Sequence, residues 1–203
     1  MSASQTARLS DELEHWLNDE ASEKTLGGLV EAFGEKSFAI LFVVLLGVPA
    51  LPIPTGGATH VFEVIAALAA LQLIVGRRTV WLPKRWQGLG LGGERQQKFL
   101  NSLMRFIRRL ERFSRPRLAF VFHHRLSDVG FGLIVIAGSA AAFVAPPFSG
   151  LDTLPALGVV LVSLGVLLED ALVAAAGAIL GIVGVALEVV LGAAAVHGLK
   201  SVL

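Results

Sequence analysis

Apolar residues run almost without interruption from residue 38 onward, and short Pro/Gly segments break the run. The first apolar stretch covers 38–53 and the second covers 61–75, with the sequence Pro-Ile-Pro-Thr-Gly-Gly at 52–57 between them. A helix cannot continue through this segment, because proline has no backbone N–H and its ring clashes with the preceding turn. The pattern predicts a helical hairpin with a Pro/Gly elbow.

A second hairpin and one longer helix follow. The apolar stretches 129–145 and 153–168 flank a breaker at 146–150, and a last stretch covers 171–196. A membrane-spanning helix needs about 20 apolar residues, with a range of roughly 17–25. The last stretch meets this length, whereas the four hairpin legs lie at or below the lower limit. We therefore expect hairpins that either span a membrane thinly or re-enter it from one side.

The two hairpins are similar in sequence, which suggests an inverted or parallel repeat. A shift of 93 residues without gaps aligns both breakers and the acid before each hairpin: Phe38 with Phe131, Pro54 with Pro147, Gly57 with Gly150, and Glu35 with Asp128. Short segments interrupted at matching positions of two repeats point to a transporter binding site, because irregular backbone at membrane depth needs protein or water to satisfy its polar groups. The alternative is that both elbows are ordinary turns at the far membrane surface.

Charge divides sharply along the chain. Residues 1–36 carry eight acids against three bases, whereas 77–128 carry thirteen Lys and Arg against three acids. Because cytoplasmic segments are enriched in Lys and Arg, we expect 77–128 in the cytoplasm, and the N-terminus too, two crossings earlier. The acidic segment, predicted as two short helices that begin at Ser10 and at a Thr25 cap, can then dock on the basic one. No apolar run precedes residue 37, so we expect no cleavable signal peptide.

Residues 94–113 form a strongly amphipathic helix. Phe, Leu and Ile follow one helical stripe from Phe99 to Phe113, and the basic side chains lie mostly off it. A helix of this kind is expected to lie in the membrane interface and to contact anionic lipid headgroups. The basic residues predicted to make these contacts are Arg95, Lys98, Arg105, Arg109 and Arg112. The regular apolar stripe and the dense apolar flanks argue against nucleic-acid binding.

The composition also favours a membrane protein. Hydrophobic residues make up 54% of the chain and charged residues 16%, and the mean hydropathy is +0.71. Soluble domains contain about 45–50% and about 25% of these classes. The sequence therefore predicts an all-α integral membrane protein with two repeated elbowed hairpins, an amphipathic interfacial region and a long C-terminal transmembrane helix. The expected segments are acidic N-terminal helices at 1–36, hairpins at 37–76 and 129–170, the basic region at 77–128, and the last helix at 171–203.

Ionisable residues inside the apolar stretches are the candidate functional groups, because each costs from about 2.5 kcal/mol upward at membrane depth. His60 and Glu63 lie three apart on one helical face, and a carboxylate beside a histidine suits a proton or cation relay. If the elbows meet near the midplane, the ion or substrate site is formed by Pro54, Thr55, Gly56, His60, Glu63, Pro147, Ser149 and Asp152, with Glu188 facing it from the last helix. Alternatively, these residues are solvated at the outer surface and cap helices there.

Motifs of the common enzyme classes are absent from the sequence. It contains no P-loop, no GxSxG, no HExxH and no dinucleotide fingerprint. The absence of cysteine also excludes disulfides, thiolate metal sites and cysteine nucleophiles. We therefore expect a protein that is not an enzyme and that needs neither a cofactor nor a metal.

A set of short motifs occurs in order between about residues 25 and 195. These motifs are GEKSF at 34–38, LPIP at 51–54, GRRTVWLP at 76–83, RLER at 109–112, RPR at 115–117, PPF at 146–148, LPA at 154–156 and LLED at 167–170. The ordered set resembles the ExoD family of bacterial exopolysaccharide-synthesis membrane proteins. Two departures concern the substrate: Ser149 and Gly150 stand where the family usually has Gly-Asn, and Ala171 stands where glycine usually follows the acidic pair.

The resemblance implies a bacterial inner (plasma) membrane protein linked to exopolysaccharide production and to tolerance of alkaline conditions. Together with the elbows, it leads to the hypothesis of a small ion- or proton-coupled transporter. Five apolar segments are few for a transport pathway, so we expect a homodimer. The alternative is a non-transporting scaffold that assists polysaccharide synthesis or export through contacts with proteins of that machinery.

Overall fold

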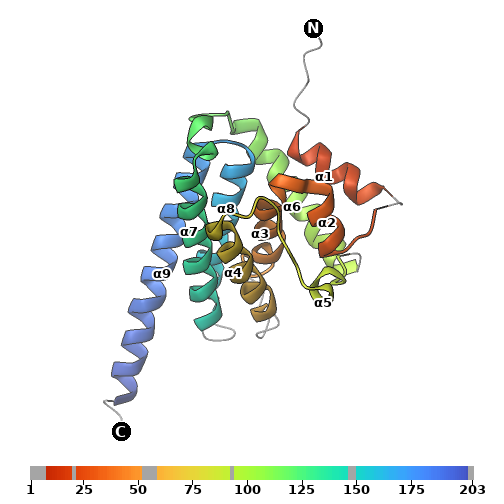
Figure 1. The fold of residues 1–203 in the computed structure, drawn as a ribbon. Helices are drawn as coiled ribbons and strands as arrows, with labels where there is room; N and C mark the ends of the chain where they lie inside the picture. The colour runs from red at the N-terminus through yellow and green to blue at the C-terminus, as the bar shows by residue number, and fades with distance from the viewer. Residues whose placement is uncertain (1–7, 20–21, 52–58, 92–93, 146–149, 201–203) are drawn as a thin grey trace.

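The computed structural model describes residues 8–19, 22–51, 59–91, 94–145 and 150–200, and these parts form an all-helical fold (Figure 1). They contain no β-strand, apart from two isolated bridges. The helices are α1 (Leu9–Asn18), α2 (Leu26–Phe33), α3 (Ser37–Gly47), α4 (His60–Val75), α5 (Lys84–Gln87), α6 (Glu94–Phe113), α7 (Arg125–Val144), α8 (Thr153–Leu167) and α9 (Ala171–Lys200), with short 3₁₀ turns at Gly34–Lys36 and Ala119–His123.

The two predicted N-terminal helices are confirmed. The Thr25 hydroxyl accepts a hydrogen bond from the Gly28 backbone N–H at 3.1 Å, which satisfies one of the free donors at the start of α2. Gly34 follows α2 with a φ of 48°, a left-handed value that glycine tolerates. Thus a cap and a glycine fix both ends of α2, as the sequence predicts.

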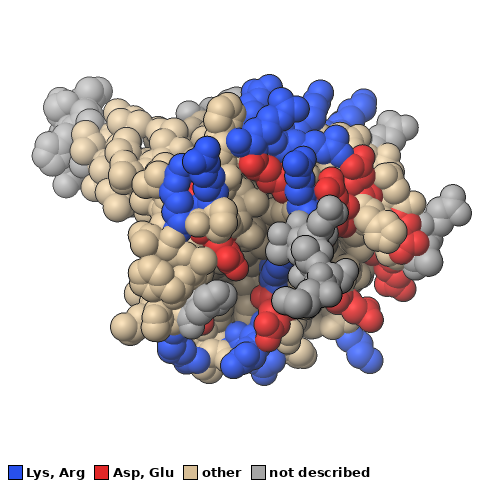
Figure 2. All heavy atoms as spheres, turned by 90° about the horizontal axis from the view of Figure 1, so that it is seen from above, with Lys and Arg blue, Asp and Glu red and all other residues tan. Residues whose placement is uncertain are grey.

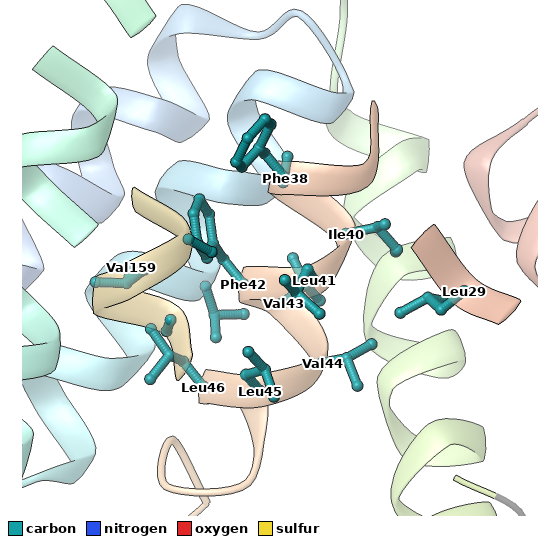
Figure 3. Close-up of a cluster of buried hydrophobic side chains, with 14 of the residues drawn as sticks. Leu29, Phe38, Ile40, Leu41, Phe42, Val43, Val44, Leu45, Leu46 and Val159 are labelled. Carbon is teal, nitrogen blue, oxygen red and sulfur yellow. The ribbon is translucent and has the colours of Figure 1, made fainter. Parts of the chain in front are cut away.

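Helix α3 forms the centre of the fold. All 11 of its residues are buried, and side chains from α2 and α8 surround it (Figure 3). The Phe42 ring meets the Phe131 ring of α7 edge to face, with centroids 5.5 Å apart. The helix ends at Gly47, where an added Cβ would lie 2.6 Å from the Phe99 ring of α6. The expected first leg at 38–53 is therefore a shorter helix that the protein itself covers on every side.

The two hairpins pack by exchanging partners. α3 contacts α8, and α4 contacts α7, more extensively than either contacts the other leg of its own hairpin. α3 and α7 run in the same direction, so the residues that flank both elbows lie at one end of the bundle (Figure 1). We call this the elbow end.

The returning legs follow the 93-residue shift seen in the sequence. α4 begins at His60 and α8 at Thr153, which correspond under this shift. Gly76, directly after α4, and Glu169, two residues after the end of α8, also correspond, and they have left-handed φ values of 100° and 52°. The first legs differ, since α3 has 11 residues and α7 has 20.

Helices α8 and α9 pack at very short range through small residues. A Cβ added to Gly158 would lie 2.5 Å from the Gly181 Cα and 2.9 Å from the Gly177 carbonyl oxygen. Only glycine permits this approach of the two backbones. The Gly177–Gly181 pattern in α9 therefore serves packing within the chain.

Helix α6 requires a correction to the sequence-based expectation. The protein's own core covers the middle of its apolar face, since Leu100, Leu103, Met104 and Ile107 are 0–6% exposed, whereas Phe106 and Phe113 are 37% and 76% exposed. The helix runs along the bundle, from Phe99 beside the elbow end of α3 to Ser114 at the opposite end, where it meets Asp170. The protein thus covers part of the apolar face that was expected to lie in the membrane interface. Amphipathic spacing identifies an apolar face but not what covers that face.

The acidic N-terminal segment docks on this helix, as predicted. The Glu14 carboxylate forms an ion pair with Arg108, and Glu111 accepts hydrogen bonds from the Ser10 backbone and hydroxyl, at 3.0 and 2.5 Å. Leu13 and Trp16 of α1 are buried in the common core. Polar pairs and apolar burial thus fix α1 against α6.

Among the residues that the structure describes, two helices are long and apolar enough to cross a membrane, Arg125–Val144 and the Ala171–Leu191 part of α9. Apolar side chains that are exposed also follow one stripe of the shorter helix α4: Val61, Val64, Leu68, Leu71 and Val75. The fold therefore has an apolar side formed by α4, α7 and α9. Its other side, formed by α1, α2, α5 and α6, lies across α3 (Figure 1), and seen from above the charged side chains gather mainly on this side (Figure 2).

Candidate functional site

The first candidate group lies at the start of α4, directly after the first elbow. His60 Nδ1 lies 2.7 Å from Glu63 Oε2, so the three-residue spacing places the two side chains on one helical face. The Glu63 side chain is 1% exposed and that of His60 is 33% exposed. A buried carboxylate thus contacts an imidazole that reaches solvent.

The second hairpin and α9 reach the same place. The ring of Phe143, near the end of α7, lies against the His60 ring with a centroid distance of 4.8 Å. Asp152, the N-cap residue of α8, lies within electrostatic range of His60, and Glu188 of α9 lies within range of Asp152. We call His60, Glu63, Asp152 and Glu188 the elbow cluster.

Two carboxylates of the elbow cluster have buried oxygens without hydrogen-bond partners. Glu63 Oε1 and both carboxylate oxygens of Glu188 are in this state among the described residues. A buried, ionised carboxylate without a donor is costly, and the cost falls when a proton or a cation binds to it. The arrangement can therefore hold protons, or supply oxygen ligands to a cation, at a point where both hairpins and α9 meet.

Several predicted site residues lie outside the described residues: Pro54, Thr55, Gly56, Pro147 and Ser149. Of the predicted site, the structure thus places His60, Glu63, Asp152 and Glu188 near one another. Within the described ranges, no group of three or more His, Asp or Glu residues is arranged to hold a metal ion.

The residues predicted to contact lipid headgroups are distributed along α6. Lys98, Arg105, Arg109 and Arg112 are exposed, and the Arg95 side chain lies outside the described part of the structure. Because α6 runs along the bundle, these charges occupy a range of heights and do not form one plane. Their contact with headgroups stays a prediction.

Sequence reasoning missed one buried polar centre, Asp170, in the turn between α8 and α9. Its carboxylate accepts hydrogen bonds of 3.0 Å from the Ser114 hydroxyl and from the backbone N–H groups of Arg115 and Leu172. The Arg117 guanidinium lies 3.8 Å away. Burial alone would raise the pKa of Asp170, but these hydrogen bonds and the Arg117 charge together hold it below its ordinary value.

Asp170 fastens the segment after α6 to the α8–α9 turn. Two backbone hydrogen bonds add to the carboxylate contacts: the Arg117 N–H donates to the Glu169 carbonyl, and the Ala171 N–H donates to the Arg117 carbonyl. A signal was present in the sequence, because RPR at 115–117 and the acid pair at 169–170 are the charged residues nearest to these ends. Their pairing needs the tertiary fold, which the sequence pattern does not supply.

Comparison with known proteins places the chain in a family. The family model described as "Exopolysaccharide synthesis, ExoD" matches residues 9–190, which include every helix start from α1 to α9. The chain belongs to the ExoD family. The match covers both hairpins, the elbow cluster and the α6 region.

Two relatives illustrate the breadth of the ExoD family. "Protein ExoD" of Rhizobium meliloti is 30% identical over 154 residues, which cover 75% of this chain and 64% of that protein. This chain therefore spans slightly less than two thirds of that relative. "Uncharacterized protein slr1875" of Synechocystis is 33% identical over 178 residues, which cover 87% of this chain and 83% of the relative. No solved structure matches the chain.

Proposed function

We propose that this ExoD-family protein is a small ion- or proton-coupled transporter of the bacterial inner membrane, with its site at the elbow cluster. Membership of the ExoD family links the protein to exopolysaccharide synthesis. The observation that carries the transport proposal is the presence of buried, unpartnered oxygens on Glu63 and Glu188 where three elements meet. Ionisable groups of this kind mark ion and proton pathways in membrane proteins.

The membrane part of the proposal rests on the apolar side of the fold. α7 and α9 are long enough to cross a bilayer, and α4 adds an exposed apolar stripe. Exposed apolar surface of this extent is unfavourable in water and favourable in lipid. In this arrangement lipid contacts α4, α7 and α9, while α1 and α6 face water or protein. A homodimer that joins two such sides would enclose a longer pathway.

The repeat supports an alternating mechanism. The two returning legs start at positions 93 residues apart, and the helix ends that flank both elbows lie at one end of the bundle. In transporters built from repeats, rocking of one unit against the other opens a site alternately to the two sides. His60, with part of its ring exposed, is placed to pass protons between solvent and Glu63.

Proton movement through the elbow cluster would connect the two traits that the family resemblance implies. Proton uptake acidifies the cytoplasm, which favours growth in alkaline medium. Polysaccharide output would then depend on this activity indirectly, through pH or ion balance. The alternative is that the protein is a membrane scaffold that moves no ions. Its helices α1 and α6 would then contact proteins that synthesise or export the polysaccharide.

A complementation experiment distinguishes the transporter from the scaffold. Cells that lack this protein would receive wild-type protein, Glu63→Gln or the control Glu31→Gln, an exposed carboxylate on α2. With matched membrane levels, a transporter requires that Glu63→Gln fail to restore exopolysaccharide output and alkaline growth, while Glu31→Gln restores both. Full restoration by Glu63→Gln would favour the scaffold.

A further inference from the structure

A groove lies between α1 and the outer face of α6. Its volume is about 650 Å³, within the range of roughly 300–1,000 Å³ for small-molecule sites. Three cationic side chains line it, Lys98, Arg105 and Arg108, against the single carboxylate of Glu14. The groove shares no residue with the elbow cluster.

The positive charge of the groove is not balanced by the protein. Glu14 is already paired with Arg108, and the nearby Glu111 is used by Ser10. In the part of the chain that the structure describes, no carboxylate pairs with Lys98 or Arg105, and Arg105 donates to the Ser102 hydroxyl at 3.0 Å. Two cations thus remain for a ligand that binds in the groove.

The other residues that line the groove favour a ligand that carries more than an anionic group. The side-chain amides of Asn18 and Asn101 can both donate and accept hydrogen bonds, which suits neighbouring hydroxyl groups. Met104, 6% exposed, and Leu17 add apolar surface against which a ring or chain can pack. The guanidinium fork of Arg105 matches the geometry of phosphate oxygens.

We propose that the groove between α1 and α6 binds a phosphate group carried on a hydroxyl-bearing molecule, with Lys98 and Arg105 on the phosphate and Asn101 on the hydroxyls. A soluble sugar phosphate and the glycerophosphate headgroup of an anionic lipid share this chemistry. Binding at this site requires no transport through the elbow cluster, so the two proposals stand or fall separately.

The test uses the full chain, purified in a neutral detergent or in nanodiscs, and four probes. Calorimetric titrations compare glucose 1-phosphate, inorganic phosphate and uncharged glucose, and the fourth measurement compares phosphatidylcholine nanodiscs with and without phosphatidylglycerol. The groove variant is Lys98→Gln with Arg105→Gln. The matched control is Lys84→Gln with Arg85→Gln, which likewise removes one Lys and one Arg charge from exposed residues, here on α5 outside the groove.

We expect saturable binding of a phosphate probe that weakens at least about tenfold in the groove variant and less than about twofold in the control, since a tenfold change corresponds to about 1.4 kcal/mol. Tighter binding of glucose 1-phosphate than of inorganic phosphate identifies the soluble source. A dependence on phosphatidylglycerol, again lost in the groove variant alone, identifies the lipid. Equal weakening in both variants, or no binding of any probe at millimolar concentration, overturns the proposal.

Discussion

The rings of His60 and Phe143 are in contact with centroids 4.8 Å apart and planes inclined by 54°, although they belong to different hairpins. His60 also contacts Glu63 at 2.7 Å on its own helix. One imidazole therefore joins a buried carboxylate to the end of the opposite hairpin. Because an imidazolium interacts more strongly than imidazole with an aromatic face, protonation of His60 would tighten the contact between the hairpins.

Replacing Glu188 by Leu should stabilise the protein. Both carboxylate oxygens of Glu188 are buried without a hydrogen-bond partner in the described structure, and Asp152 adds like charge nearby. Removal of such a group relieves a desolvation cost, so we expect a gain of about 1–3 kcal/mol in the free energy of unfolding. Denaturant unfolding in detergent measures this gain. A clear loss of stability would show that Glu188 has a stabilising partner.

Replacing Gly158 by Ala should separate α8 from α9. The new Cβ would lie 2.5 Å from the Gly181 Cα, and backbone atoms cannot yield as a flexible side chain can. We expect a loss of about 1–3 kcal/mol. Gly130→Ala is the matched control in helix α7, where the new Cβ meets nothing within 4 Å, and it should gain about 0.5–1 kcal/mol. Thermal unfolding of both variants tests the contrast, and equal effects would contradict the close packing.

Asp170 should make stability depend on pH in acid. Because the pKa of Asp170 is lowered in the folded protein, the unfolded chain takes up the proton first as the pH falls. The stabilisation that ionised Asp170 contributes is therefore complete above the pKa of about 3.9 in the unfolded chain, and it is lost as the pH falls through the pKa in the folded protein. Asp170→Asn should cost about 1–3 kcal/mol at pH 7.

To test this, the free energy of unfolding is measured for wild type and for Asp170→Asn across this pH range. The difference between wild type and Asp170→Asn should shrink as the medium becomes acidic. Glu169→Gln, at the neighbouring residue, serves as the control for the removal of one carboxylate from this turn. A gap between wild type and Asp170→Asn that stays constant down to strong acid would show that the charge of Asp170 contributes nothing.

Single cysteines should separate the lipid-facing side from the water-facing side. The natural chain has no cysteine, so each introduced thiol reports alone. Ile182→Cys on α9 replaces a side chain that is 69% exposed, and Asn101→Cys on α6 replaces another exposed one. In liposomes, a membrane-impermeant maleimide should label Asn101→Cys after permeabilisation and leave Ile182→Cys unlabelled. Equal labelling of both would contradict lipid contact by α9.

Local signals predicted much of this fold. The Thr25 cap, the hairpin legs at 61–75 and 153–168 and the inward-facing Glu188 follow from helical spacing, capping chemistry and the cost of exposing charge to lipid. The sequence did not show that the protein itself covers part of the apolar face of α6, because spacing shows which face is apolar, whereas what covers that face depends on tertiary packing. α3 was expected as a hairpin leg. That the protein encloses it on every side also depends on tertiary packing, which spacing along the sequence does not show. Asp170 was missed because Ser114, Arg115 and Arg117, which contact it, lie more than 50 residues away in sequence.

The central claim is that Glu63 carries ions or protons, and flux into proteoliposomes tests it most directly. Purified protein would be reconstituted with an internal pH-sensitive dye, and gradients of H⁺, Na⁺ and K⁺ would be imposed in turn. We predict a protein-dependent flux that Glu63→Gln abolishes and Glu31→Gln preserves, with both variants folded. Absence of flux under every gradient, or equal flux through both variants, would contradict the account.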